Sequence, residues 1–399
     1  INRDRFILSG GHGSMLLYSL LHLFGYGLTI EDLKQFRQED SMTPGHPEYR
    51  HTIGVEATTG PLGAGMAMAV GMAMAEAHLG AEFNKEGYPI IDHFTYVLGG
   101  DGCMMEGITS EAMSLAGTLG LGKLIVLYDS NNISIEGNTD IAFTEDVKKR
   151  FEAYGFQTLV VEDGNNLKEI GAAIEAAKAD LGRQTMITVK TKIGFGSPKE
   201  GLASAHGEPL GDENIKAMKE KLGWPSEEPF YVPEEVYANY KAIADQKAGD
   251  EASWNELFDE YCKKYPEMKA LWEQYFDENA AKQLLDNDEF WAFADKPEAT
   301  RNLSGMAINR LKNYLPNLIG GSADLAPSTK TYMSGMGDFS KDNYAGRNLH
   351  FGIRELAMTG IGNGLMLHGG LRAFVSTFFV FSDYVKPMAR LSALMGVPL

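Results

Sequence analysis

The clearest pattern of apolar and polar positions lies between residues 94 and 135. An apolar run at 94–98 ends in glycine and aspartate at 99–102, apolar residues recur at helical spacing over 108–119, and a second apolar run covers 124–128. Short apolar runs on either side of a helical segment are typical of buried strands. We therefore predict strand, helix, strand, and a crossover of this length makes the two strands parallel.

The same alternation appears on the C-terminal side of this unit. We predict a helix after residue 145, a strand at 157–162, a helix at 167–181 and a strand at 185–191. From residue 301 the pattern resumes with a helix at 303–315, strands at 318–325, 348–352 and 372–379, a loop holding Pro327 and Ser328, and a helix beginning near Glu355. Residues 211–295 are charged and aromatic, without strand signals, and their helical pattern breaks at Pro266.

These patterns predict the α/β fold class, with two doubly wound parallel-sheet domains joined by a helical connector. We expect a first domain at 1–265 that includes the start of the connector, the rest of the connector at 266–299, and an incomplete second domain at 300–399. The chain starts without Met and stops at MGVPL, where a helix has just ended and a strand should begin. We therefore expect a fragment of a longer protein.

Two polar residues follow the two strands of the first unit. Asp101 and Asn131 should lie at strand carboxyl ends, where open parallel sheets bind ligands. Their oxygens and a backbone carbonyl near Ile133 suit Mg²⁺ that also binds a diphosphate. The residues alone leave open a plain crossover, in which Gly-Asp-Gly is only a strand-to-helix turn.

Three histidines lie beside glycine or proline. His12 precedes a helical run in a glycine-rich turn, where free N–H groups favour phosphate, although a capping or core role is an alternative. His46 lies between prolines in TPGHPE, where it could also be a turn residue, and His206 lies in SAHGEP. The loop at 58–65, rich in glycine and proline, should let backbone approach a flat ligand.

Composition narrows the possible partners. The formal net charge of −18 argues against nucleic acid or an anionic membrane as partner. The weakly polar stretch 60–75 is too short and too mildly apolar to span a bilayer. Cys103 and Cys262 match no metal or disulfide spacing, which fits a reducing compartment.

One combination of motifs carries a resemblance to a known family. Gly100-Asp101-Gly102, followed after 103–130 by Asn131-Asn132, resembles the thiamine-diphosphate signature, and the run GDGCMMEGITSEA resembles the transketolase family in particular. The likeness covers nearly the whole chain, from SGGHG near the start to RLSALMGVP at the end.

The resemblance implies a transferase that moves a two-carbon ketol unit between ketose and aldose sugar phosphates. It implies thiamine diphosphate and Mg²⁺, for which Ca²⁺ or Mn²⁺ could substitute. It further implies a cytoplasmic enzyme of the pentose phosphate pathway, and a homodimer with active sites at the subunit interface. The first domain would bind the diphosphate and metal, and the second the pyrimidine.

Matched position by position, the resemblance also assigns roles to residues. The metal ligands would be Asp101, Asn131 and the Ile133 carbonyl. The cofactor contacts would be His12, Gly60, Leu62, Gly102, Glu106, Asn131, His206, Asp324, Glu355, Phe378, Phe381 and Tyr384. The substrate contacts would be His46, His206, Arg301 and Ser328, and the catalytic residues would be Glu355, His206 and His46.

These residue types suit their roles. A buried acid at Glu355 can hold a proton on the pyrimidine ring, and Arg301 offers a fixed fork to a terminal phosphate. The sequence departs from the family pattern at SGGH in place of SNGH, at Met42 in place of a basic residue, and at Leu356 in place of histidine. The last departure puts a neighbour of Glu355 in doubt.

Two other functions remain open at this point. One is a dihydroxyacetone synthase, which would use the same machinery with formaldehyde as acceptor. The other is a non-catalytic thiamine-diphosphate-binding or dimer-scaffold protein. The intact Asp101, Asn131, Glu106 and Glu355 count against this second alternative.

Overall fold

The computed structural model describes residues 1–399, and its first part is built on a sheet of five parallel strands. In spatial order these are β1 (Arg5–Leu8), β2 (Thr95–Gly100), β3 (Leu124–Ser130), β7 (Thr185–Lys190) and β6 (Gln157–Val161). The pairing is in parallel register throughout, so Gly100 at the end of β2 lies opposite Asp129 on β3. The carboxyl ends of β1, β2 and β3 therefore meet at one edge.

Helices cover both faces of this sheet, because alternate strand residues point to opposite sides. Val97, Leu124 and Val126 belong to the largest core cluster, whereas Ile125 and Ile187 belong to a smaller cluster on the other face. The first face is covered by α3 (Ala64–Phe83), α5 (Gly107–Leu119) and α6 (Val147–Ala153), and the second by α1 (Ser14–Leu23) and α7 (Leu167–Ala179). The predicted α/β class is confirmed.

The second sheet has three parallel strands in the order β10-β8-β9. These strands are β8 (Leu318–Ser322), β9 (Asn348–His350) and β10 (Arg372–Ser376). Helix α13 (Thr300–Tyr314) packs on one face, and α15 (Glu355–His368) packs on the other, with α16 (Ser382–Met395) beside it. The predicted parallel architecture is therefore found here too.

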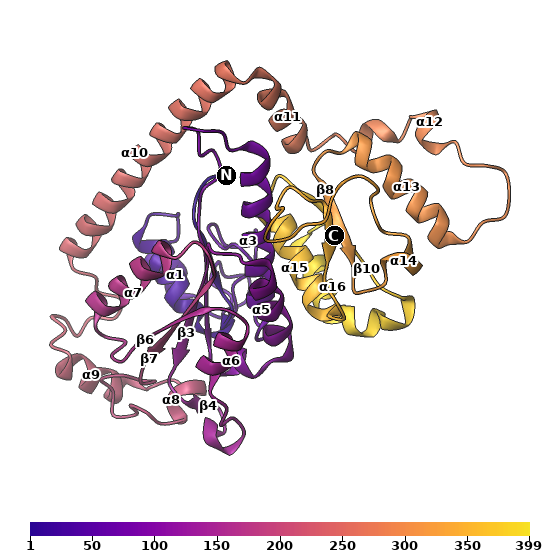
Figure 1. Ribbon diagram of the computed structural model, residues 1–399. Coiled ribbons are helices and arrows are strands. Elements are labelled where there is room, and N and C mark those ends of the chain that lie inside the picture. The colour runs from indigo at the N-terminus through magenta and orange to yellow at the C-terminus, as the bar shows by residue number, and fades with distance from the viewer.

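A run of helices joins the two parts (Figure 1). It comprises α8 (Ser204–Gly207), α9 (Asp212–Lys221), α10 (Glu234–Lys264), α11 (Pro266–Phe276) and α12 (Asp288–Trp291). Helix α10 follows the outside of the first part, where Trp254 and Tyr261 donate hydrogen bonds to the carbonyls of Ile90 and Phe83. Pro266 starts a new helix, because proline is tolerated in a first turn but not in a helix interior.

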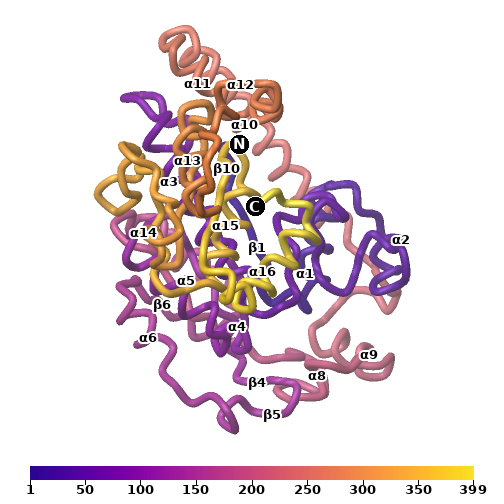
Figure 2. Tube along the Cα trace, turned by 90° about the vertical axis from the view of Figure 1, so that its right-hand side faces the viewer, coloured from indigo at the N-terminus to yellow at the C-terminus, as the bar shows by residue number.

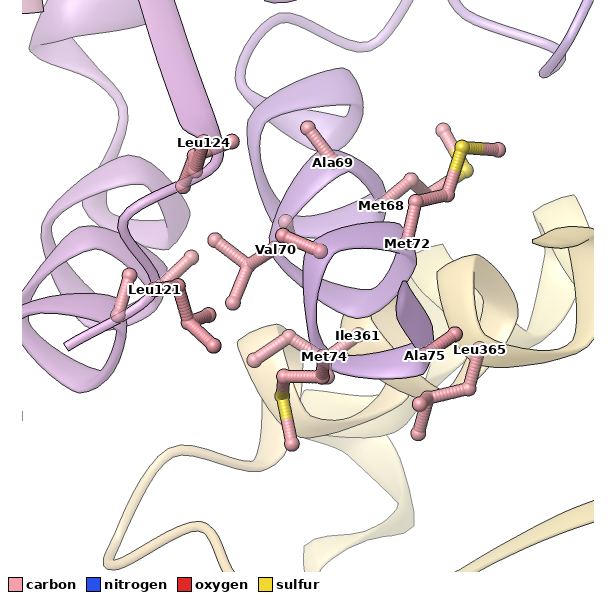
Figure 3. Close-up of a cluster of buried hydrophobic side chains, with 14 of the residues drawn as sticks. Met68, Ala69, Val70, Met72, Met74, Ala75, Leu121, Leu124, Ile361 and Leu365 are labelled. Atoms are coloured by element: carbon pink, nitrogen blue, oxygen red, sulfur yellow. The ribbon is translucent and has the colours of Figure 1, made fainter. Parts of the chain in front are cut away.

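The two parts meet where α3 crosses α15. A Cβ added to Gly71 would lie 2.1 Å from the Ile361 carbonyl oxygen, and one added to Gly364 would lie 2.0 Å from the Met68 carbonyl oxygen. The two backbones therefore touch directly at the crossing. Figure 3 shows α3 between Leu124 at the start of β3 and α15, so one buried core runs through both parts.

Several details differ from the predictions. The sequence analysis missed strand β1 and the small hairpin of β4 (Ile133–Ser134) and β5 (Gly137–Asn138). Pro327 and Ser328 lie in a short helix, α14 (Ala326–Thr329), and not in a loop, because a proline at N1 or N2 favours a helix start. Residues 323–325 and 377–379 fall outside strands β8 and β10. Helix α2 (Ile30–Lys34) is short and begins with a capping box at Thr29.

Candidate active site

Asp101 and Asn131 lie at the shared carboxyl edge of the first sheet, as their spacing predicts. Asp101 directly follows β2 and is the first residue of α4 (Asp101–Met105), and Asn131 directly follows β3. The β4–β5 hairpin and α8 lie at this end of the molecule, opposite the end that holds α11 and α12 (Figures 1 and 2).

The Asp101 carboxylate is buried, with only 4% of the residue exposed. Its Oδ1 accepts a hydrogen bond from the Tyr128 hydroxyl at 2.6 Å, and its Oδ2 accepts one from the Asn132 N–H at 2.9 Å. No basic side chain pairs with it, and burial raises the pKa of Asp101. A buried carboxylate without a cationic partner is costly, so this site is well suited to a bound cation.

The Asn131 amide is held by its neighbours on both sides. Its Oδ1 accepts a hydrogen bond from the Ile133 N–H at 3.0 Å, and its Nδ2 donates to Asp129 Oδ2 at 3.4 Å. Asn132 adopts a left-handed backbone conformation, with φ at +60°, as the chain turns into β4. No group of three His, Cys, Asp or Glu side chains is placed to hold a metal ion. Any metal here would therefore need the amide and carbonyl oxygens of this turn.

The three histidines gather at the same edge. The ring of His12, in the 3₁₀ turn Gly11–Gly13, lies 5.0 Å from the ring of His206 in α8. Desolvation and then the nearby His206 and His46 rings lower the pKa of His12. The imidazole of His12 is therefore neutral at pH 7, with one ring N–H donor and one acceptor.

The His46 loop is fixed by α1. The Tyr18 hydroxyl donates to the carbonyl of Pro44 at 2.8 Å, and the Ser14 hydroxyl donates to that of Gly45 at 2.9 Å. The His46 ring then lies against Gly60, where a Cβ would come within 3.3 Å of it. Gly60 has φ of +140°, which side chains rarely tolerate, so this loop depends on glycine.

Gly102, Leu62 and Glu106 lie around the start of α4 and α5. A Cβ on Gly102 would lie 2.7 Å from Leu62 Cδ1. Glu106 is exposed at the break between the two helices, and its Cβ would be 3.0 Å from a Cβ added to Gly63. The structure therefore brings the predicted first-domain residues together at one edge.

Glu355 is the first residue of α15 and is half-buried. Its Oε1 accepts a hydrogen bond from the Thr377 hydroxyl at 3.3 Å. The same turn is tied to α5, because the Glu111 carboxylate accepts from the Ala357 N–H at 3.0 Å. Burial raises the pKa of Glu111.

The three aromatic residues predicted as cofactor contacts form a cluster on the surface of the single chain. The rings of Phe378 and Phe381 are stacked 6.2 Å apart, and Tyr384 lies 6.2 Å from Phe381. Phe378 is 39% and Tyr384 63% exposed. Asp324 is also exposed, with φ of +64°.

Arg301 and Ser328 lie on α13 and α14, which pack against each other. Arg301 is exposed and Ser328 half-buried, and no hydrogen bond joins them. Within one chain, no hydrogen bond or aromatic contact connects the second-domain candidates with the three histidines. The candidates thus form a first-domain group and separate second-domain groups.

Tyr128, Asp129 and Glu111 are contacts that the sequence analysis missed. Tyr128 and Asp129 lie three and two residues before the predicted Asn131, at the end of a strand, and this position was an available signal. Glu111 lies on α5 and gave no signal, because its partner is a backbone N–H of a distant helix.

With this geometry established, comparison with known proteins is decisive. Residues 1–280 match the family model for the transketolase thiamine diphosphate binding domain, and residues 296–399 match that for the transketolase pyrimidine binding domain. The chain belongs to the transketolase family.

Individual transketolases support this membership. The chain is 56% identical over 400 residues to transketolase from Geobacillus stearothermophilus and 53% identical over 403 residues to that from Bacillus subtilis. Each alignment covers 100% of this chain and 60% of the relative. The chain thus spans about 60% of the length of these transketolases.

Solved transketolase structures have the same fold. Transketolase from Leishmania mexicana matches with a TM-score of 0.93 at 44% identity, covering 100% of this chain and 59% of that one. A Pichia stipitis transketolase in complex with sedoheptulose 7-phosphate matches with a TM-score of 0.94 at 44% identity, covering 100% and 60%. None of the helices is long and apolar enough to cross a bilayer.

Proposed function

We propose that this chain is the cofactor-binding part of a transketolase, which moves a two-carbon ketol unit from a ketose phosphate to an aldose phosphate. The observation that carries the proposal is the buried Asp101, without a basic partner, at the same sheet edge as three histidines in a chain of this family. We divide the chain into a diphosphate- and metal-binding domain at 1–265, a connector at 266–299 and a pyrimidine-binding domain at 300–399. The reaction belongs to the pentose phosphate pathway.

Asp101, Asn131 and the Ile133 carbonyl would hold Mg²⁺, or Ca²⁺ or Mn²⁺ in its place. The fit rests on the buried carboxylate, which has no basic partner, so that a bound cation would stabilise its ionised form. Hard divalent cations prefer such oxygen ligands and leave positions for phosphate oxygens. When bound, thiamine diphosphate supplies the nucleophilic carbon that takes up the two-carbon unit.

His12, His46 and His206 would contact the diphosphate and the substrate. Neutral imidazoles can donate to or accept from sugar hydroxyls and can move protons at them. Glycine at positions 60 and 102 allows close backbone approach, while Leu62 and Glu106 would complete the cofactor contacts.

Glu355, with Asp324 and the aromatic cluster of Phe378, Phe381 and Tyr384, would bind the pyrimidine end of a cofactor held by a second copy of the chain. The support is the exposed apolar surface around this cluster, where Phe379 is 93% and Val380 69% exposed. Apolar surface of this kind marks an interaction site, so we propose a homodimer with active sites at the subunit interface. Arg301 and Ser328 would bind the substrate phosphate.

The test is an acceptor assay on the whole protein of which this chain is the cofactor-binding part, with xylulose 5-phosphate as donor. Ribose 5-phosphate should be converted to a seven-carbon ketose phosphate, with little turnover of formaldehyde. A preference for formaldehyde would instead identify a dihydroxyacetone synthase, and cofactor binding without turnover would identify a scaffold protein.

We also propose that the protein is cytoplasmic. The support is that Cys103 and Cys262 are both free thiols, as expected in a reducing compartment. Fractionation of the source cells would test this.

A further inference from the structure

The carboxylate of Asp129 lies at the candidate site and is not among the predicted site residues. It is half-buried on β3, two residues before Asn131, and it takes part in no ion pair. Its Oδ1 accepts a hydrogen bond from the Thr191 hydroxyl, and its Oδ2 accepts one from Asn131 Nδ2 at 3.4 Å. The Asn131 hydrogen bond places the two side chains next to each other at the end of the strand.

The chemistry of these contacts determines which way the Asn131 amide faces. An ionised carboxylate only accepts hydrogen bonds, so Asp129 selects the Nδ2 side of the amide. The Ile133 N–H only donates, so it selects the Oδ1 side. Together they leave the amide oxygen on the side of the β4 turn, and an amide can bind a hard cation only through its oxygen.

Thr191 holds Asp129 from the neighbouring strand. It directly follows β7, whose residues Val189 and Lys190 pair with Asp129 and Ser130 of β3. A strand-end hydroxyl is a rigid anchor, because the sheet fixes its backbone. Two hydrogen bonds, from Thr191 to Asp129 and from Asn131 to Asp129, thus connect the end of β7 with the proposed metal ligand.

We propose that Asp129 is a positioning residue for the divalent metal, which orients the Asn131 amide and adds a second negative charge behind Asp101, and that Thr191 holds it in place. This inference rests on the proposed function. Groups that orient metal ligands in this way typically contribute about 10- to 100-fold to metal affinity.

The test measures Mn²⁺ binding to the purified protein by electron paramagnetic resonance, in the presence of thiamine diphosphate. Asp129→Asn keeps the shape of the side chain but places an amide where only an acceptor fits, so we expect Mn²⁺ affinity to fall about 10- to 100-fold. Thr191→Val, which removes only the anchoring hydroxyl, should lower the affinity less. Excess Mn²⁺ should restore cofactor binding in Asp129→Asn, as followed by near-ultraviolet circular dichroism.

Asp140→Asn is the matched control, because Asp140 is exposed near the same edge and makes no hydrogen bond or ion pair through its side chain. It should bind Mn²⁺ as the wild type does. Equal losses in Asp129→Asn and Asp140→Asn would indicate a general charge effect and overturn the inference. If the wild type binds Mn²⁺ and both Asp129→Asn and Thr191→Val bind it with unchanged affinity, the role of Asp129 is wrong but the proposed function stands. If the wild type binds no Mn²⁺, the proposed function is wrong as well.

Discussion

At the scale of single residues, Asp101 is a buried carboxylate without a basic partner. It is buried, it is hydrogen-bonded only by a hydroxyl and an N–H, and no cation in the chain offsets its charge. Tyr128 and Asn132 satisfy its oxygens without neutralising them. Burying its charge is therefore costly, and a bound cation would offset this cost.

We predict that Asp101→Ala abolishes metal-dependent cofactor binding, because this is the only anionic ligand in the proposed shell. Asn131→Ala should weaken binding less, since it removes a neutral ligand. Titration of thiamine diphosphate with and without Mg²⁺, followed by near-ultraviolet circular dichroism, measures both effects. Unchanged affinity in Asp101→Ala would contradict the metal assignment.

Arg301 gives a second prediction at this scale. It is exposed at the start of α13 and makes no hydrogen bond or ion pair through its side chain. Arg301→Ala should raise KM for phosphorylated sugars by a factor equivalent to about 1.5–3 kcal/mol of binding free energy, the scale of a hydrogen bond to a charged group. KM for a donor without phosphate should not change. Steady-state kinetics with both donors decides, and an equal loss with each would reject the phosphate role.

At the scale of elements, the contact of α3 with α15 allows a direct test. We predict that Gly71→Ala lowers the free energy of unfolding by about 1–3 kcal/mol, because its Cβ would overlap the Ile361 carbonyl oxygen. The control is Gly249→Ala in the exposed part of α10, where a Cβ meets nothing within 4 Å. There alanine should stabilise the helix by up to about 1 kcal/mol. Urea denaturation of both variants makes the comparison, and a neutral Gly71→Ala would show that the crossing can relax.

How far the sequence predicts the structure also varies from element to element. The long apolar strands β2, β3 and β7 and the placement of Asp101 and Asn131 follow from periodicity, because buried parallel strands leave a clear pattern. Strand β1 was missed because it is only four residues long and begins with Arg5. The tie between Glu111 and Ala357 could not be predicted, since a residue pattern encodes the face of an element and not its distant partner.

At the scale of the whole molecule, a buried histidine pair joins the two parts. The Nε2 atoms of His93, just before β2, and His368, at the end of α15, are 2.9 Å apart. Burial, followed by the charge of Arg5, lowers the pKa of His93 to about 3 and lowers that of His368 well below its ordinary value. Both rings are therefore neutral in the folded protein at pH 7, with one donating to the other.

This pair predicts how stability depends on pH. Below about pH 6.5 the unfolded chain binds protons at both histidines and the folded chain does not, so acid favours unfolding. As the pH falls from 6.5 towards the folded-state pKa, each histidine should lower the free energy of unfolding by about 1.4 kcal/mol per pH unit. Urea denaturation at pH values from 7 to 4.5 measures how the free energy of unfolding depends on pH. In His368→Gln the slope of this free energy against pH should be smaller by about this amount. An unchanged slope would mean that the pair already binds a proton in the folded state.

The glycine contact between α3 and α15 limits which substitutions these two helices can accept. Gly364 lies nine residues after Glu355 on one continuous helix, a rise of about 13.5 Å. Any side chain at Gly71 or Gly364 would push the two helices apart. Because α15 is a continuous helix, this displacement would also move its first residue, Glu355. Substitutions at these two glycines are therefore expected to shift Glu355, although neither glycine is adjacent to it in the sequence.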